Sequence, residues 1–221
     1  MLQSLLRLGA PLISVPLLLA GPVAQDRASL LLNPDAPEFR LEAPERVLVR
    51  LESSVGTIDI EVVRRWAPRG ADRFVALTRH GYYDEARFFR LRPGRWVQFG
   101  INGNPQIAQA WRNRTFPDDP FVQSNTRGTV AFAFAVPNGR ATQVFINTGD
   151  NSASHDKEPF TPFGRVVSGM SHVDAINAEH GEGPGGIRAG KQDPFFAGGN
   201  VWLLREFPRL DFIRRAVVVE P

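Results

Sequence analysis

Apolar and polar residues alternate in two adjacent stretches of the chain. In the first, Val47, Val49 and Leu51 alternate with charged residues, and the same alternation returns over residues 57–62. A period of two is typical of strands with one buried face. Gly56 lies in the short segment between the two stretches, where a turn is needed. The pattern therefore predicts a β-hairpin.

Two other stretches carry helical signals. The first begins at Pro68, whose missing N–H costs nothing in a first turn, and ends before Gly81, which suits a left-handed C-cap. The second helix is predicted over residues 171–180. There Ser171 and Asp174 have the spacing of a capping box, with Asp in place of the usual Glu.

The remaining regular pattern is strand-like. It covers residues 88–91, 96–101, 130–136, 144–147 and 162–167. Many short strands with only two helices predict a mainly β protein. A closed antiparallel barrel is the expected arrangement, because closure hides the strand edges.

The first 25 residues differ in character from the rest. They carry one charge, Arg7, followed by a largely apolar run over residues 8–20. The run is shorter than the about 20 apolar residues that a bilayer-spanning helix needs. A basic start, a short apolar core and small residues before Asp26 are typical of an export signal. We predict a signal peptide over residues 1–24 and an exported protein, periplasmic or extracellular; the alternative is an uncleaved segment that anchors the chain to a membrane.

Prolines mark the next segment. Residues 25–45 contain Pro34, Pro37 and Pro44 and show no hydrophobic period. They predict a linker or an N-terminal arm. Residues 46–221 then remain as one domain of ordinary size.

Composition and charge exclude several classes of function. The 26 basic and 23 acidic residues give a net charge of +3, and all basic residues except Lys157 and Lys191 are Arg. Acids lie between the arginines along the whole chain, so no basic face for nucleic acid is predicted. The absence of Cys excludes disulfides, thiolate nucleophiles and thiolate metal sites. The four His follow no zinc-ligand spacing, so we expect no metal and no cofactor. We also expect a monomer, with no membrane span once the signal is cleaved.

Two apparent motifs fail on their context. Ser154, His155 and Asp156 are consecutive, whereas the members of a catalytic triad converge from separate elements. Residues 181–186 match G-x-G-x-x-G by letter, but they follow a predicted helix rather than a strand. We interpret them as a surface loop. The residues alone therefore point to no common acid–base, nucleophilic or metal chemistry.

A series of longer motifs occurs in fixed order along the chain. They are RFFRLRPG at 87–94, VQFG at 97–100, QVFIN at 143–147 and FTPFGRV at 160–166. They resemble the cyclophilin family of peptidyl-prolyl cis–trans isomerases. With further matching residues, among them 67–68, 127–128, 169–170 and 207–211, the resemblance covers roughly residues 46–217. Order and spacing make this match far more specific than one short pattern. The resemblance implies an eight-stranded antiparallel barrel capped by two helices, with residues 46–221 as a cyclophilin-like isomerase domain.

The resemblance also implies an activity and a set of site residues. The activity is rotation about X–Pro bonds in protein folding, and the partners are Pro-containing peptides and unfolded or partly folded proteins. Arg90 matches the catalytic Arg, whose guanidinium binds the twisted amide more strongly than the planar one. The matching substrate-binding positions are Trp96, Gln98, Ala133, Phe134, Gln143, Phe145, His155 and Phe160.

This chain departs from the family at the predicted pocket. Arg95 and Trp96 stand where an apolar pair is usual, and Phe134 replaces the usual Asn. An Arg at the pocket floor reduces apolar contact with proline unless it turns outward, and Trp96 can fill the space or block it. An active isomerase is the first hypothesis. A weak or inactive module that binds Pro-containing peptides is the alternative, and an unrelated small-ligand barrel is disfavoured by the ordered motifs.

Overall fold

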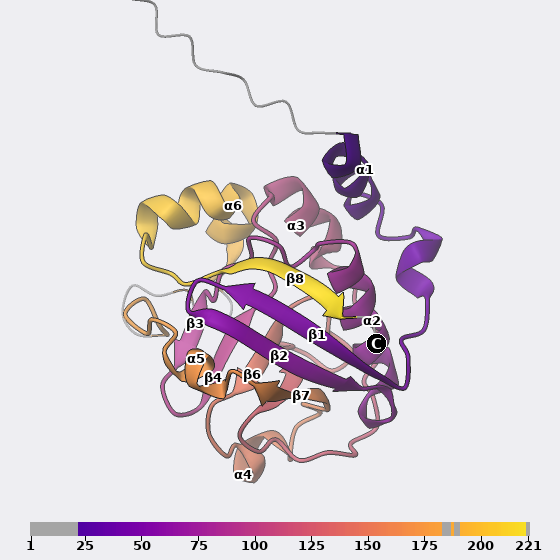
Figure 1. The fold of residues 1–221 in the computed structure, drawn as a ribbon, viewed down its shortest axis with the longest axis vertical. Coiled ribbons are helices and arrows are strands. Elements are labelled where there is room, and N and C mark those ends of the chain that lie inside the picture. The colour runs from indigo at the N-terminus through magenta and orange to yellow at the C-terminus, as the bar shows by residue number, and fades with distance from the viewer. Residues whose placement is uncertain (1–21, 183–186, 188–190, 220–221) are drawn as a thin grey trace, which may run out of the picture.

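The computed structural model describes residues 22–182, 187 and 191–219 (Figure 1). Most of the predicted signal peptide, residues 1–21, lies outside the described residues. Within the described ranges, no helix has both the length and the apolar character needed to cross a membrane.

Eight strands form one antiparallel sheet, which confirms the predicted mainly β class. In sheet order the neighbours are β3-β4-β6-β5-β7-β2-β1-β8. The bounds are β1 Arg46–Ser53, β2 Gly56–Val63, β3 Arg90–Arg92, β4 Trp96–Phe99, β5 Thr129–Phe132, β6 Val144–Asn147, β7 Pro162–Ser168 and β8 Ile213–Val219. The predicted hairpin is β1–β2, paired from Arg46↔Val63 to Ser53↔Gly56. The other predicted strands shift by a few residues at their ends, and β8 was not predicted from periodicity.

The sheet closes through a short contact rather than through a full ladder. The segment before β3 forms an isolated antiparallel bridge, Arg87↔Phe212, with the start of β8. The Phe88 N–H donates to the Asp211 carbonyl at 2.9 Å, and the Ile213 N–H donates to the Ala86 carbonyl at 2.9 Å. The predicted closure is therefore looser than in a barrel whose edge strands pair along their length.

Helices cover the ends and sides of this sheet (Figure 1). Their bounds are α1 Pro22–Leu31, α2 Pro68–Arg79, α3 Pro105–Arg112, α4 Ser152–His155, α5 Met170–Asp174 and α6 Asp193–Glu206, with short 3₁₀ turns at η1 Pro37–Arg40 and η2 Arg64–Trp66. The predicted helix at Pro68 is α2. The expectation of only two helices is wrong, because α3 and α6 pack against each other as an additional pair.

The second predicted helix is too long. Instead of residues 171–180, helix α5 covers Met170–Asp174. Beyond it, the Asn177 N–H donates to Asp211 Oδ2 at 2.7 Å. A tertiary hydrogen bond therefore replaces the continuation of the helical ladder.

The predicted capping box is also wrong. The N-cap of α5 is Gly169, in the left-handed region at φ 83°, and no side chain caps the helix. Ser171 therefore lies inside the helix. Asp174 binds Arg127 in an ion pair, with Oδ2 2.6 Å from Nη2.

Residues 26–45 form an arm that packs on the barrel. The Trp111 indole N–H of α3 donates to the Leu31 carbonyl at the end of α1 at 2.8 Å. Phe39 of η1 stacks edge-on against Trp111, with ring centroids 4.7 Å apart. Leu31 and Phe39 are buried, so this stretch is a packed arm rather than a free linker.

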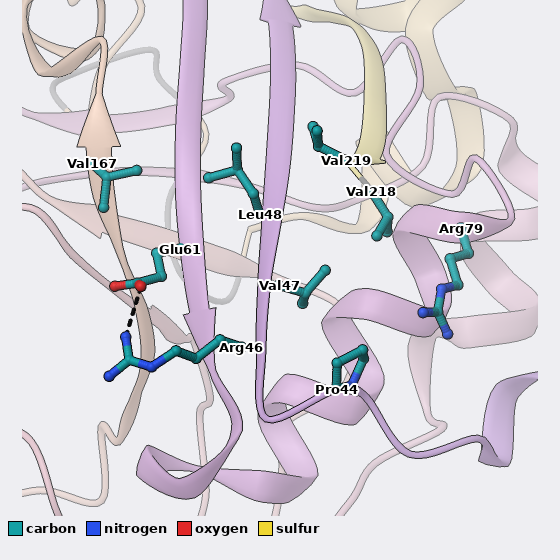
Figure 2. A pocket seen from close by; sticks show the side chains of 9 residues that line it. All are labelled: Pro44, Arg46, Val47, Leu48, Glu61, Arg79, Val167, Val218 and Val219. Atoms are coloured by element: carbon teal, nitrogen blue, oxygen red, sulfur yellow. Dashed lines mark hydrogen bonds and ion pairs between the residues drawn. The ribbon is translucent and has the colours of Figure 1, made fainter. Parts of the chain in front are cut away.

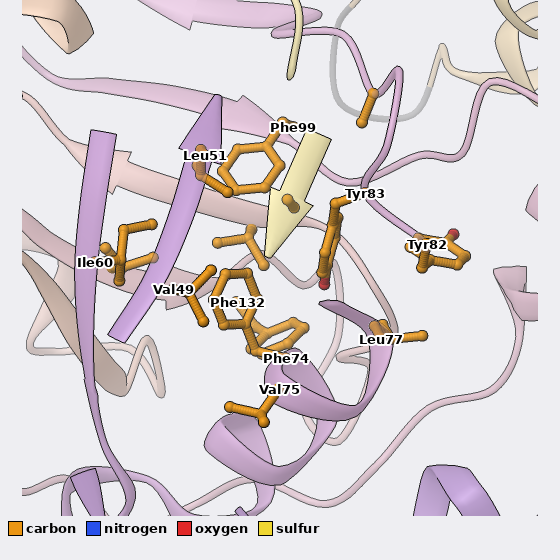
Figure 3. Packing of buried hydrophobic residues seen from close by; sticks show 14 of the residues in the cluster. Val49, Leu51, Ile60, Phe74, Val75, Leu77, Tyr82, Tyr83, Phe99 and Phe132 are labelled. Atoms are coloured by element: carbon orange, nitrogen blue, oxygen red, sulfur yellow. The ribbon is translucent and has the colours of Figure 1, made fainter. Parts of the chain in front are cut away.

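The core fills the barrel with aromatic and branched side chains (Figure 3). Phe74 from α2 packs against Phe163 and Tyr83, with ring centroids 4.9 and 5.3 Å apart. Phe132 from β5 contacts the same Phe163 ring at 5.2 Å. The amphipathic face of α2 thus closes one side of the core, and the sheet supplies the rest.

Asp119 caps α2 from a distant loop. Ala67, at the N-cap position, has no side-chain acceptor. Asp119 Oδ1 accepts the Arg69 N–H at 3.0 Å, and Oδ2 accepts the Gly70 N–H at 2.9 Å. We expect Asp119→Ala to lower the free energy of unfolding by about 1–2 kcal/mol, as for loss of other N-caps.

Urea denaturation of Asp119→Ala measures this loss, with the exposed Glu158→Ala as a control that should change little. Equal midpoints for Asp119→Ala and the wild type, with equal slopes, would contradict the capping role.

Candidate functional site

The site lies on the outer face of β3, β4 and β6. Val97 and Ile146 point into the core, so their neighbours in the strands point outward. Arg90 pairs with Gln98 across β3 and β4, and Gln98 pairs with Phe145 across β4 and β6. Cross-strand partners lie on the same face. A guanidinium, an amide and an aromatic ring are thereby aligned side by side.

A chain of hydrogen bonds holds the guanidinium. Arg90 Nη1 donates to Gln98 Oε1 at 2.9 Å, and Gln98 Nε2 donates to Gln143 Oε1 at 2.6 Å. Gln143 Nε2 donates to Gln192 Oε1 at 2.8 Å. The two predicted glutamines therefore orient Arg90. Gln192, just before α6, extends the chain and was not predicted.

Arg90 also binds a carboxylate that the sequence did not indicate. Its Nη2 lies 2.5 Å from Glu182 Oε1. The Glu182 N–H donates to the carbonyl of Leu91, the residue after Arg90, at 3.2 Å. The Glu182 backbone is therefore anchored to β3. In the sequence, Glu182 is distinguished only as the acidic residue within the glycine-rich stretch 181–186.

Aromatic rings form the wall next to Arg90. Phe145 lies 5.5 Å from Phe160 and 5.6 Å from His155 between ring centroids. Phe134 stacks on Phe160 at 4.3 Å, and Trp96 meets His155 edge-on at 5.5 Å. Rings from separate strands and loops thus make one apolar surface, which suits a compact saturated ring such as that of proline.

A cavity of about 160 Å³ adjoins this wall, because Phe134 belongs to both. Its lining includes Arg90, Gln98, Ala133, Phe134, Gln143 and Gln192. The Ala133 N–H donates to the Gln143 carbonyl at 2.9 Å. Five of the nine predicted site residues therefore line this cavity. The other four, Trp96, Phe145, His155 and Phe160, form the adjoining wall of rings, and the roles of all nine are still predictions.

Arg95 turns toward α4. Its Nη2 donates to Ser154 Oγ at 3.1 Å. Its guanidinium carbon lies 5.9 Å from the centre of the Trp96 ring. Trp96 contacts His155 in the wall of rings, and Arg95 lies beside this wall.

Burial in this wall lowers the pKa of His155 below its usual 6.5. The charge of Arg95 lowers the pKa further, whereas a hydrogen bond with the Asn151 backbone and the charge of Asp156 raise it. The imidazole is therefore neutral at pH 7. Protonation would place a charge among Trp96 and the phenylalanine rings.

This gives a pH prediction for binding of Pro-containing peptides. Because the pKa is depressed, affinity is expected to be constant at pH 7 and above, and to fall as the pH drops through the His155 pKa, below 6.5. Arg95→Gln removes a like charge and should move the fall to higher pH. Titrations of wild type, Arg95→Gln, His155→Gln and the control His172→Gln measure it. The same fall in His155→Gln as in wild type would exclude His155 as its source.

A second cavity, of about 700 Å³, lies beside β1, β2, β7 and β8 (Figure 2). Val47, Leu48 and Val218 give it an apolar lining, and its Arg46 and Glu61 neutralise each other at 2.7 Å. It contains none of the predicted site residues. Among the described residues, no cluster of three or more His, Asp or Glu side chains is placed to hold a metal ion.

Comparisons with known proteins agree on one family. Residues 48–192 match the family model for the cyclophilin type peptidyl-prolyl cis-trans isomerase/CLD. A peptidyl-prolyl cis-trans isomerase of Acinetobacter baylyi is 30% identical over 133 residues, which cover 58% of this chain and 71% of the relative. The isomerase cypE of Dictyostelium discoideum is 32% identical over 133 residues, 59% of this chain and 84% of the relative.

Solved structures show the same fold. A cyclophilin type isomerase of Cryptosporidium parvum superposes with a TM-score of 0.57 at 16% identity, covering 80% of this chain and 99% of that one. A structure of that protein in the presence of the dipeptide Ala-Pro gives a TM-score of 0.56 at 17% identity, covering 79% of this chain and 99% of that one.

Proposed function

Because the chain belongs to the cyclophilin-type peptidyl-prolyl cis–trans isomerase family, we propose that its groove accelerates rotation about X–Pro bonds in unfolded or partly folded proteins. One observation carries this proposal. An oriented guanidinium, Arg90, lies beside an aromatic wall that includes Phe145. That pairing supplies an apolar surface for the proline ring and a charged donor for the amide.

The chemistry needs no proton transfer and no covalent intermediate. Rotation about a peptide bond must overcome resonance, with a barrier of about 18–20 kcal/mol. In the twisted state the proline nitrogen loses its conjugation and becomes basic. A donor fixed beside that nitrogen binds the twisted amide better than the planar one, and this difference lowers the barrier.

Arg90 retains donors for this purpose. A guanidinium carries five N–H bonds. In the groove Gln98 and Glu182 accept from the two terminal nitrogens. Arg90 Nε is buried and has no acceptor among the described residues. The hydrogen bonds to Gln98 and Glu182 fix the plane of the guanidinium, so little reorganisation is needed when the amide twists.

The ion pair with Glu182 also favours a second candidate, a module that binds Pro-containing peptides with little turnover. A carboxylate 2.5 Å from Nη2 reduces the charge that Arg90 offers to a twisted amide. Trp96, which occupies part of the pocket wall, acts in the same direction.

The two candidates differ in catalysis at low protein concentration. A short Ala-Pro peptide is moved from its equilibrium cis fraction, and its relaxation is followed with protein at a small fraction of the peptide concentration. If the protein is an isomerase, the relaxation time should be shorter than the tens to hundreds of seconds of the free peptide. Relaxation at the rate in buffer, with measurable binding, would favour the module.

We also propose that the protein is exported, on the basis of residues 1–24. The basic start, short apolar core and small residues support this proposal. Intact-mass measurement of the chain recovered from a bacterial host tests it. Loss of about 24 residues is expected, and a full-length chain in the membrane fraction would support the anchored alternative.

A further inference from the structure

The turn between β3 and β4 places two arginines at one end of the groove. Arg92 and Arg95 are its first and fourth residues, and the Arg95 N–H donates to the Arg92 carbonyl at 3.0 Å. Pro93 and Gly94, the latter at φ 70°, supply the residues that a type II turn requires. The turn fixes the two Cα atoms within about 7 Å of each other.

Both guanidiniums gather around one indole. The guanidinium carbons of Arg92 and Arg95 lie 5.5 and 5.9 Å from the Trp96 ring centre, and that of Arg90 lies at 5.4 Å. The three guanidiniums carry like charges and repel one another, and cation–π attraction to the indole offsets this repulsion. Three positive charges are thus concentrated beside the proline wall.

Only Arg90 of these three has an acidic partner among the described residues. Its partner is Glu182, whereas no described carboxylate lies within ion-pair distance of Arg92 or Arg95. The nearby Asp156 carboxylate accepts from Ser124 and from Asn125 instead. Glu179 and Glu182 line a cavity together with Arg92, but they pair with Arg209 and Arg90. The turn therefore presents two guanidiniums with no direct ion pair among the described residues.

Buried donors beside these charges lack acceptors as well. Arg95 Nε and Trp96 Nε1 are both inaccessible to solvent, and neither has a hydrogen-bond partner in the described part of the chain. Leaving such donors unsatisfied costs free energy.

We propose that Arg92 and Arg95 determine substrate specificity, and select segments in which an acidic residue lies close to the isomerised proline. The inference rests on the proposed function, because it assigns a preference to the same groove. A side-chain carboxylate is the acceptor that matches paired guanidiniums. Arg95, which stands where the family usually has an apolar residue, thereby gains a role in recognition.

Three matched peptides test the preference: Ac-Ala-Xaa-Ala-Pro-Ala-Xaa-Ala-amide, with Xaa as Glu, Gln or Lys. Placing Xaa on both sides brings one copy near the arginines in either chain direction. Dissociation constants and catalysed exchange rates are measured for each. Glu is expected to bind about fivefold more tightly than Gln, and Lys more weakly than Gln. The difference should shrink at about 0.5 M NaCl, because salt screens exposed charges.

Two double variants identify the source. Arg92→Gln with Arg95→Gln should equalise the three peptides. Arg65→Gln with Arg215→Gln removes the same charge from exposed positions on η2 and β8 and should preserve the ranking. Equal affinities for Glu and Gln peptides in the wild type, a ranking that survives the first variant, or no binding of any peptide would each overturn the inference.

The exchange rates separate this inference from the proposed function. Catalysed exchange with no charge preference overturns the inference and leaves the isomerase standing. Preferential binding of the Glu peptide without catalysis supports the inference and contradicts the isomerase.

Discussion

Replacement of Arg90 by alanine is expected to reduce the catalysed exchange of an Ala-Pro peptide by about 10²–10³-fold, the usual cost of removing a preorganised donor to a transition state. The loss should fall on kcat rather than on KM. The aromatic wall, including Phe145 and Phe160, remains to bind the proline, whereas the donor to the twisted amide is gone.

Two further variants control for other causes of that loss. Arg90→Lys keeps the charge but cannot donate to Gln98 and Glu182 together with fixed geometry, so it should recover only part of the rate. Arg65→Gln, at an exposed position on η2, should behave as wild type. Equal kcat in wild type and Arg90→Ala would contradict the role given to Arg90.

The largest effect on stability is expected at Phe132. Its side chain is 1% exposed and stacks edge-on against Phe116 at 5.1 Å and on Phe163 at 5.2 Å. Phe132→Ala removes a ring from the middle of the barrel and leaves a cavity. Because β5 pairs with β6 on one side and β7 on the other, the backbone cannot move to fill that cavity. We expect a loss of about 3–5 kcal/mol, a large share of the about 5–15 kcal/mol that stabilises an ordinary domain.

Urea or thermal unfolding measures this loss. Phe121→Ala is the matched control, because that ring is 50% exposed, and it should change stability by less than about 0.5 kcal/mol. Similar losses of unfolding free energy in the two variants would contradict the role of Phe132 in core packing.

Much of the sheet could be predicted because its strands alternate clearly. The β1–β2 hairpin and α2 follow from periodicity and from their end signals, Gly56 and Pro68. Strand β8 was missed because Arg214 and Arg215 are adjacent and interrupt the alternation; its pairing with β1 supplies the missing support. Helix α6 was missed because glycines interrupt it, and Gly199 has non-helical dihedrals at a kink.

The site divides in the same way. Arg90, Gln98 and Phe145 lie in ordered motifs, and cross-strand pairing brings them together. Glu182 and Gln192 belong to no strand and to none of the motifs that resemble the cyclophilin family. Glu182 meets Arg90 across 92 positions of the chain, a distance at which local pattern carries no information. Asp119 is a similar case, since it caps α2 from 50 positions away in the chain.

The central claim is that Arg90 binds the twisted amide more strongly than the planar one. Its most direct test is the exchange rate of the bound peptide, measured by NMR for wild type and Arg90→Ala at protein concentrations that give equal occupancy of the groove. We predict fast exchange in the wild-type complex and a bound-state rate about 10²–10³-fold lower in the variant. Equal bound-state rates in the two proteins would contradict it.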